Sequence, residues 1–146
     1  MPKKNELQRQ VMDAIVAAEE KKAEDVTVLE LDKSAGGFTD YFVICSGSNP
    51  RQIQAISDEV EQRLSRAGLR PAHTEGYKQA EWVLLDYVDF VVHVFSQKAR
   101  NFYNLERLWK SAKQLTPGEL RSAPRTRTRA TKTSPTRRTR RRVRKT

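Results

Sequence analysis

The alternation of apolar and polar residues predicts an ordered series of helices and strands along the first 120 positions. Apolar residues recur at helical spacing from Asn5, a candidate cap, to about Ala23, and again after Pro50, where the helix is expected to stop at Gly68. Runs of apolar and β-branched residues between these helices predict strands. The expected strands are Val26–Leu31, Tyr41–Ser46, Arg70–Glu75, Trp82–Tyr87 and Phe90–Phe95.

A last helical stretch, from about Phe102 to Ala112, precedes Pro117-Gly118, where the folded body is expected to end. The order of elements is typical of an α/β fold, and we predict a single domain with a mixed sheet of about five strands flanked by helices. The strand Tyr41–Ser46 is continuously apolar, which favours a central position with both faces buried.

The last two strands are so close in sequence that they must pair as an antiparallel hairpin. A two-residue turn at Val88-Asp89 would separate a purely apolar face from a mixed face, because side chains alternate along a strand. A three-residue turn would instead place His93 with Val83 and Leu85. We favour the two-residue turn, because such a separation is expected when helices cover only one face of the sheet. The mixed face would carry Trp82, Leu84, Asp86, Val91, His93 and Phe95.

The mixed face is a candidate docking surface, because interface centres are rich in aromatic residues and a few polar groups add orientation. The alternative is that a helix covers this face too, with Trp82 as ordinary core and His93 as a satisfied buried histidine. Acid–base catalysis by His93 is a weaker hypothesis, since no nucleophile stands at a readable spacing.

Charge changes the picture at the C-terminus. The chain has 28 Lys+Arg against 18 Asp+Glu, a net charge of +10. Of these, 12 basic residues and no acidic residue lie in 121–146, which leaves 16 basic and 18 acidic residues, a net charge of −2, in 1–120. The Arg/Thr-rich segment has too few apolar residues to offset the entropy of ordering. We predict a folded domain over 1–120 and a disordered basic tail over 121–146.

Several kinds of site and location are disfavoured by composition. The single cysteine, Cys45, excludes an internal disulfide, and with only His73 and His93 the sequence predicts no metal site and no cofactor. Cys45 is expected to be a small buried apolar residue rather than a redox sensor. No apolar run approaches the roughly 18 residues of a membrane helix, so we expect a cytoplasmic protein.

Several blocks of residues, taken in order, resemble one known family. The blocks are Asp40-Tyr41-Phe42-Val43-Ile44, Ser46-Gly47-Ser48, Arg51, Glu75-Gly76, Glu81-Trp82-Val83-Leu84-Leu85-Asp86-Tyr87, Asp89, Val92-His93-Val94-Phe95, Phe102-Tyr103-Asn104-Leu105-Glu106 and Leu108-Trp109. Over about residues 6–113 the chain is similar to the ribosomal silencing factors, also called Iojap-related proteins. The resemblance implies a nucleotidyltransferase-like fold and a translational repressor. Such a repressor binds large-subunit ribosomal protein fourteen and blocks joining of the small subunit, notably in nutrient shortage.

The resemblance also implies partner-contact residues, which largely coincide with the mixed face. They are Trp82, Leu84, Asp86, Tyr87, Asp89, His93 and Phe95, with Tyr103 and Leu105 on the following helix. One departure is Val88, where the family usually has Gly. A β-branched residue resists the positive φ of a two-residue turn, so a bulged turn is the alternative there. A homodimer through the first helix or the mixed face is also consistent with the resemblance.

An enzymatic alternative arises from the implied fold. Nucleotidyltransferases use a Gly-Ser at a helix start to hold phosphate and an Asp-x-Asp on the next strand to hold magnesium. Gly47-Ser48 does precede a helix, but the following strand carries only Glu75. Asp86 and Asp89 stand too far apart to replace the pair. We therefore expect an ordinary helix start at this loop and no enzymatic activity.

The basic tail offers the other alternative, an RNA-binding ribosome-associated or assembly factor. Its arginines would contact phosphates without reading sequence, because no aromatic residue stands among them. The candidate RNA-binding residues are Arg125, Arg127, Arg129, Arg137, Arg138, Arg140, Arg141 and Arg142. We favour a supporting role beside ribosomal RNA, and a merely solubilising extension is the other interpretation.

Overall fold

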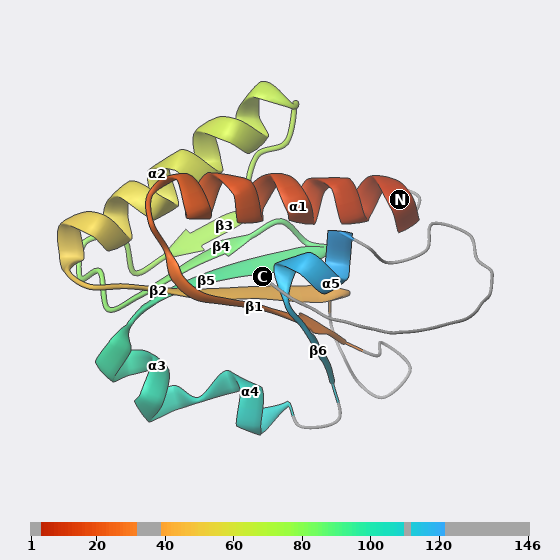
Figure 1. The fold of residues 1–146 in the computed structure, drawn as a ribbon. Helices are drawn as coiled ribbons and strands as arrows, with labels where there is room; N and C mark the ends of the chain where they lie inside the picture. Colours follow the sequence, from red (N-terminus) through yellow and green to blue (C-terminus); the bar gives the residue numbers. More distant parts are fainter. Residues whose placement is uncertain (1–3, 32–38, 110–111, 122–146) are drawn as a thin grey trace.

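The computed structural model describes residues 4–31, 39–109 and 112–121 (Figure 1). These residues form a mixed sheet of six strands in the order β3-β4-β5-β2-β1-β6. The strands are β1 (Glu24–Glu30), β2 (Tyr41–Gly47), β3 (His73–Glu75), β4 (Trp82–Asp86), β5 (Phe90–Ser96) and β6 (Lys113–Leu115). The central strands β2 and β5 are parallel, and the other neighbouring pairs are antiparallel. The predicted α/β domain with a mixed sheet is confirmed.

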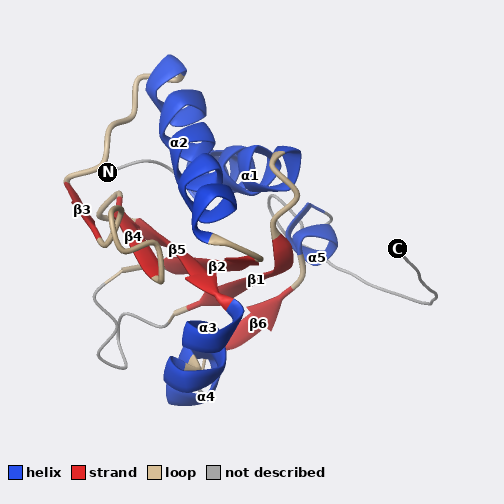
Figure 2. Cartoon of the chain, turned by 90° about the vertical axis from the view of Figure 1, so that its left-hand side faces the viewer, coloured by secondary structure: helices blue, strands red, loops and turns tan. Residues whose placement is uncertain are grey.

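Helices cover both faces of the sheet, as the two perpendicular views show (Figures 1 and 2). On one face lie α1 (Lys4–Glu20) and α2 (Pro50–Arg66), with α5 (Pro117–Arg121) beside α1. On the other face lie α3 (Gln97–Tyr103) and α4 (Leu105–Leu108). The layers are unequal, because the first face is covered by two long helices and the second by two short ones.

The helix α2 forms where the sequence pattern predicts it. The side chain of Asn49 caps its first turn by accepting a hydrogen bond from Gln52 N at 2.8 Å, and Pro50 occupies the first turn, where no partner is needed for a backbone N–H. Its buried residues are Ser57 and the four apolar residues that recur at helical spacing after Pro50, namely Ile53, Ile56, Val60 and Leu64. After Arg66 the chain leaves the helix through Gly68, whose φ of 85° suits a residue without a side chain.

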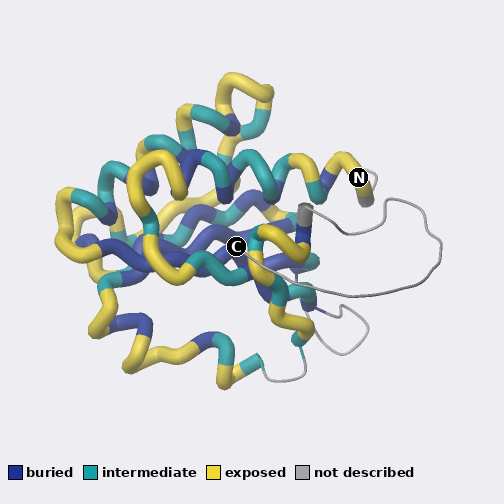
Figure 3. The backbone as a smooth tube through the Cα atoms, in the orientation of Figure 1, coloured by how far each residue is buried: buried dark blue, intermediate teal, exposed yellow. Residues whose placement is uncertain are grey.

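The central strands β2 and β5 are buried between the two helix layers, whereas the edge strand β3 is exposed (Figure 3). The larger core cluster packs α1 and α2 against Val43, Val83, Leu85 and neighbouring strand residues. The second cluster lies on the opposite face and includes Phe42 and Phe95. All seven positions of β2 are buried, so its predicted central place is confirmed. Cys45 is buried in the larger cluster, as expected.

The hairpin of β4 and β5 has the two-residue turn. Leu85 pairs with Val92, and Tyr87 N donates to Phe90 O at 2.9 Å, which leaves only Val88 and Asp89 between the strands. The three-residue and bulged alternatives are therefore wrong. Val88 accepts a φ of 73° despite its β-branched side chain.

The region after β5 differs from the sequence prediction. The predicted single helix from about Phe102 to Ala112 is wrong: the chain breaks at Asn104, whose φ of 45° is left-handed, and α4 ends at Leu108. The strand β6 then pairs with β1, and α5 begins at Pro117, where the body was expected to end. At three residues, β6 is too short to show strand alternation in sequence.

Smaller boundary differences occur elsewhere. Because α1 already begins at Lys4, Asn5 lies within the helix and is not its cap. The strand β1 starts at Glu24, and β3 is limited to His73–Glu75. Residues 122–146 lie outside the described residues, so the predicted disorder of the tail stays a prediction.

Candidate functional site

Trp82 is the centre of the aromatic group on the mixed face. It is half-buried at the start of β4, with its ring centroid 4.6 Å from that of Tyr103 and 5.0 Å from that of Phe95. Its Nε1–H donates to Nδ1 of His93 at 3.0 Å. Two neighbouring rings and one hydrogen bond therefore hold the indole, while part of its surface stays accessible to a partner.

His93 lies under the indole on β5 and is 3 % exposed. Indole nitrogen can only donate, so Nδ1 of His93 must accept, and the ring proton of the neutral imidazole stands on Nε2. Burial lowers the pKa of His93 to about 3, which keeps the ring neutral near pH 7. The aromatic ring of Phe42 packs against it edge to face, with centroids 4.5 Å apart. A neutral, buried ring suits a role in orienting Trp82 and not acid–base exchange with solvent.

Nε2 of His93 is buried and has no hydrogen-bond partner among the described residues. An unsatisfied buried donor has a cost in folding free energy, so its presence is a feature that packing alone would not favour. The alternative in which a helix covers this face too is thus right in two respects, since α3 and α4 lie on this face and His93 is buried, although Nε2 of His93 has no partner among the described residues.

The structure divides the predicted contact residues into three groups. Trp82, Leu84, Asp86 and Asp89 are half-buried, and Tyr103 is 44 % exposed. Beneath them, His93, Phe95 and Leu105 are buried. Tyr87 is buried on the opposite face, in the cluster that packs against α1 and α2, so it does not join the mixed face. The accessible surface is therefore smaller than the predicted set, and it is supported from below by the buried group.

Two apolar residues of the short helices are exposed, and one of them, Phe102, extends this surface. Phe102 is 79 % exposed on α3, and its ring centroid lies 5.0 Å from that of Tyr103, while Leu108 is 70 % exposed on α4. Both lie in the stretch that was predicted to be one continuous helix. Closely spaced apolar residues at Phe102-Tyr103 and Leu108-Trp109 were the available signal, because adjacent residues on a helix do not share one face. We call Trp82, Leu84, Asp86, Phe102 and Tyr103 the apolar platform.

A buried ion pair fixes the short helices to the sheet. Arg100 on α3 lies with Nη2 at 2.7 Å from Oε2 of Glu106 on α4. Its Nη1 also donates to Oγ of Ser46 at 3.0 Å, and Nη2 donates to Oγ1 of Thr27 at 3.2 Å. One guanidinium group thus joins β1, β2, α3 and α4, which sets where Tyr103 stands relative to Trp82.

The Gly47-Ser48 loop has its polar groups engaged within the protein. Ser48 N donates to Oε1 of Gln52 at 2.6 Å, and Gln52 N donates to Asn49. A side-chain carbon added at Gly47 would stand 2.8 Å from Cγ1 of Ile53, so close packing of α2 on β2 explains the glycine. The loop has the hydrogen bonds of a capped helix start. Within the described ranges no group of His, Cys, Asp and Glu residues is arranged to hold a metal ion.

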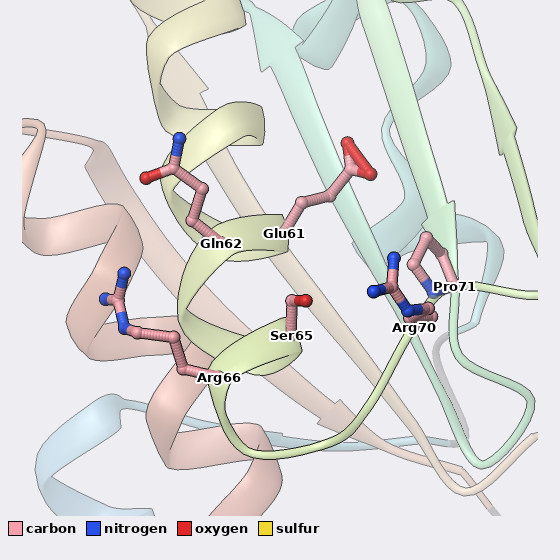
Figure 4. A pocket seen from close by; sticks show the side chains of 6 residues that line it. All are labelled: Glu61, Gln62, Ser65, Arg66, Arg70 and Pro71. Atoms are coloured by element: carbon pink, nitrogen blue, oxygen red, sulfur yellow. The ribbon is translucent and has the colours of Figure 1, made fainter.

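An open groove of about 410 Å³ lies elsewhere, along the C-terminal half of α2 and the segment after it (Figure 4). Its lining residues are Glu61, Gln62, Ser65, Arg66, Arg70 and Pro71. Burial, and secondarily Asp58, raises the pKa of Glu61. Arg66 extends from the side of the helix away from Arg70, so the two guanidinium groups do not converge on one anion. None of the predicted contact residues lines this groove.

Helices in the described part of the chain are all too short or too polar to cross a membrane.

The chain is similar to proteins of one family. Residues 4–144 match the family described as "Ribosomal silencing factor during starvation", so the match extends past residue 113 into the basic tail. A ribosomal silencing factor of Halalkalibacterium halodurans is 43 % identical over 99 residues, which are 68 % of this chain and 84 % of that protein. The mitochondrial Iojap-related protein of Arabidopsis thaliana is 30 % identical over 95 residues, covering 62 % of this chain and 50 % of that protein.

The fold agrees with these matches. A crystal structure of a Chromobacterium violaceum protein superposes with a TM-score of 0.68 at 33 % identity, covering 70 % of this chain and 85 % of that chain. The full-length family match and the identity to named silencing factors, together with the shared fold, lead to one conclusion: this chain belongs to the ribosomal silencing factor family.

Proposed function

We propose that this protein is a cytoplasmic translational repressor that binds the large ribosomal subunit through large-subunit ribosomal protein fourteen. The partner comes from the family resemblance, and the description of the matching family, with its reference to starvation, supports action under nutrient limitation. The single structural observation that supports the proposal is the apolar platform: a half-buried, oriented Trp82 continuous with exposed Tyr103 and Phe102.

The platform has the properties of a docking surface. Its aromatic side chains offer large apolar area at low cost in side-chain entropy, and Asp86 adds a charge at the edge of the apolar row. Its supports are rigid, because Trp82 is hydrogen-bonded to His93 and α3 is attached to the sheet through Arg100. A preorganised surface loses less entropy on binding, which favours affinity.

The mechanism in this proposal is steric. The platform docks on one ribosomal protein, and the two long helices on the opposite face of the sheet project away from the large subunit, where the small subunit would join. No bond is made or broken, so repression lasts as long as the complex. An interface of standard size, roughly 1,600 Å² in total, is sufficient for such a complex.

The test is cosedimentation of the purified chain with separated large and small subunits, followed by a subunit-joining assay. Binding to large subunits alone, with inhibition of joining at the same protein concentrations, is the expected result. Equal binding to both subunits, or binding to large subunits without effect on joining, contradicts the steric mechanism. Ribosomal protein fourteen is tested separately, as a purified partner in a direct binding measurement.

A second candidate function rests on the basic tail. With 12 basic and no acidic residues in 121–146, the tail would contact ribosomal RNA and add salt-dependent affinity to the complex. In this proposal the folded domain supplies selectivity, and the tail supplies faster encounter and longer residence. Binding of a chain that lacks the tail to large subunits separates the contribution of the folded domain from that of the tail.

A further inference from the structure

The tip of the β4–β5 hairpin has an unusual backbone. Asp89 N donates to Tyr87 O at 2.8 Å, which closes a three-residue γ-turn centred on Val88. The φ of Val88 is 73°, so this is the rare and strained form of that turn. Strain is greatest for a β-branched residue, because its Cβ substituents crowd the backbone when φ is positive.

The surrounding structure holds this strained turn in one conformation. Val88 N donates to Oδ1 of Asp86 at 2.8 Å, and Oγ1 of Thr39 donates to Val88 O at 2.8 Å. Asp40 N donates to Asp89 O at 3.0 Å, and Tyr87 N donates to Phe90 O. Every backbone N–H and C=O from Tyr87 to Asp89 is thus hydrogen-bonded, which is the condition under which local strain persists.

The Val88 side chain, by contrast, is mostly exposed to solvent and contributes little to packing. It is 62 % exposed, whereas the hydroxyl-bearing Thr39 that braces the turn is fully buried. Gly or Asn would accept the same backbone at lower cost, so neither packing nor turn geometry accounts for a valine here. The residue follows β4 at the hairpin tip, and its backbone N–H is hydrogen-bonded to the side chain of Asp86, the last residue of that strand.

We propose that Val88 is a contact residue of the docking surface, an apolar knob held ready by the strained turn to enter an apolar recess on the protein partner. This inference rests on the proposed function and extends its surface from the apolar platform to the hairpin tip. The occupant is protein and not RNA, because Asp86 and Asp89 flank the knob and their carboxylates repel phosphate.

The test uses Val88→Gly and Val88→Asn in the full chain, since both residues tolerate positive φ. The midpoint of thermal unfolding is expected to rise, because strain is relieved. Binding to isolated large subunits is expected to weaken by about tenfold, because the apolar contact is lost. Opposite signs for stability and binding separate a contact role from a structural one. Tyr77→Ser is the control: Tyr77 is 40 % exposed, hydrogen-bonds to Asp58 on α2, and should leave binding unchanged.

Failure of the proposed function and failure of the Val88 inference give different results. If the unsubstituted chain does not bind large subunits, the proposed function fails and this inference fails with it. If that chain binds and both Val88 variants bind equally well, only this inference is overturned. If the variants lose stability and binding together, Val88 is structural, which also overturns the inference.

Discussion

Arg100 and Glu106 form an ion pair across the helix break at Asn104, with Nη2 of Arg100 2.7 Å from Oε2 of Glu106. Their side chains are 10 % and 21 % exposed. The pair also carries the hydrogen bonds from Arg100 to Ser46 and Thr27, so its geometry is determined from three sides. The position of Tyr103 over Trp82 therefore depends on a polar network and not on apolar packing alone.

Removing one partner of this pair is expected to be costly. Glu106→Gln leaves the Arg100 guanidinium in a nearly closed site with its charge uncompensated, and we expect a loss of about 3 kcal/mol in the free energy of unfolding. Denaturant titration measures it. The matched control is Glu20→Gln, because Glu20 pairs with Arg63 at 3.7 Å on the exposed surface and should cost less than about 1 kcal/mol. Equal costs for the two variants would show that burial of the pair is unimportant.

Trp82→Ala is expected to weaken binding to isolated large subunits by at least about 2 kcal/mol, because a large aromatic anchor is lost from the centre of the platform. The fold should survive, since Trp82 is only half-buried. Cosedimentation gives the affinity, and far-ultraviolet circular dichroism gives the fold. Normal cosedimentation by a folded variant contradicts the assignment of this surface.

Acid sensitivity should report on His93. Burial lowers the pKa of His93 from its ordinary 6.5 to about 3. Above pH 6.5 both folded and unfolded chains hold the ring neutral, so no effect is expected. Between pH 6.5 and about 3 the unfolded chain binds the proton and the folded chain does not. The free energy of unfolding therefore decreases as the pH is lowered through this range, by up to about 1.4 kcal/mol per pH unit.

The comparison variant is His93→Gln, which cannot titrate and keeps an acceptor for Trp82. Unfolding measured from pH 7.5 to pH 4 should show a shallower loss of stability in the variant than in the unsubstituted chain. Parallel curves would mean that His93 takes up its proton in the folded protein near its ordinary pKa.

Cys45 should be unreactive in the folded protein. It is fully buried, and burial raises the pKa of its thiol to about 12, so little thiolate forms at neutral pH. A thiol-specific reagent should modify it only at the rate of unfolding, and reactivity should rise with denaturant in step with the loss of structure. Fast modification in native buffer would contradict this burial.

Deleting residues 122–146 should flatten the salt dependence of ribosome binding and retain selectivity for the large subunit. The deleted segment carries 11 of the 12 basic residues of the tail, and each phosphate contact contributes to the salt slope. Binding measured at several salt concentrations, on both subunits, gives the slope and the selectivity. Loss of selectivity on deletion would mean that the tail, and not the folded domain, recognises the large subunit.

The hairpin was predictable from the sequence, and the segment after it was not. The alternation around Val88-Asp89 was enough to choose the register, because helices must cover the purely apolar face. The residues after Phe95 gave a wrong single helix for two reasons. The break at Asn104 is local, because this left-handed residue caps α4 by accepting a hydrogen bond from Arg107 N, and the apolar spacing alone did not reveal it. The pairing of β6 with β1 is a contact between segments far apart in sequence. Tyr87 was assigned to the contact surface by resemblance, although its place in the register puts it on the buried face.

The sequence by itself determined the principal helices, the central strands and the family, because periodicity and ordered motifs are local properties of the chain. Only the tertiary structure decided which apolar residues reach solvent. Phe102 and Leu108 point outward because Arg100 and Glu106 fix two short helices where one was expected, and His93 is buried because Phe42 and Trp82 close over it. Burial depends on neighbours far apart in sequence, and that information appears only when the chain is folded.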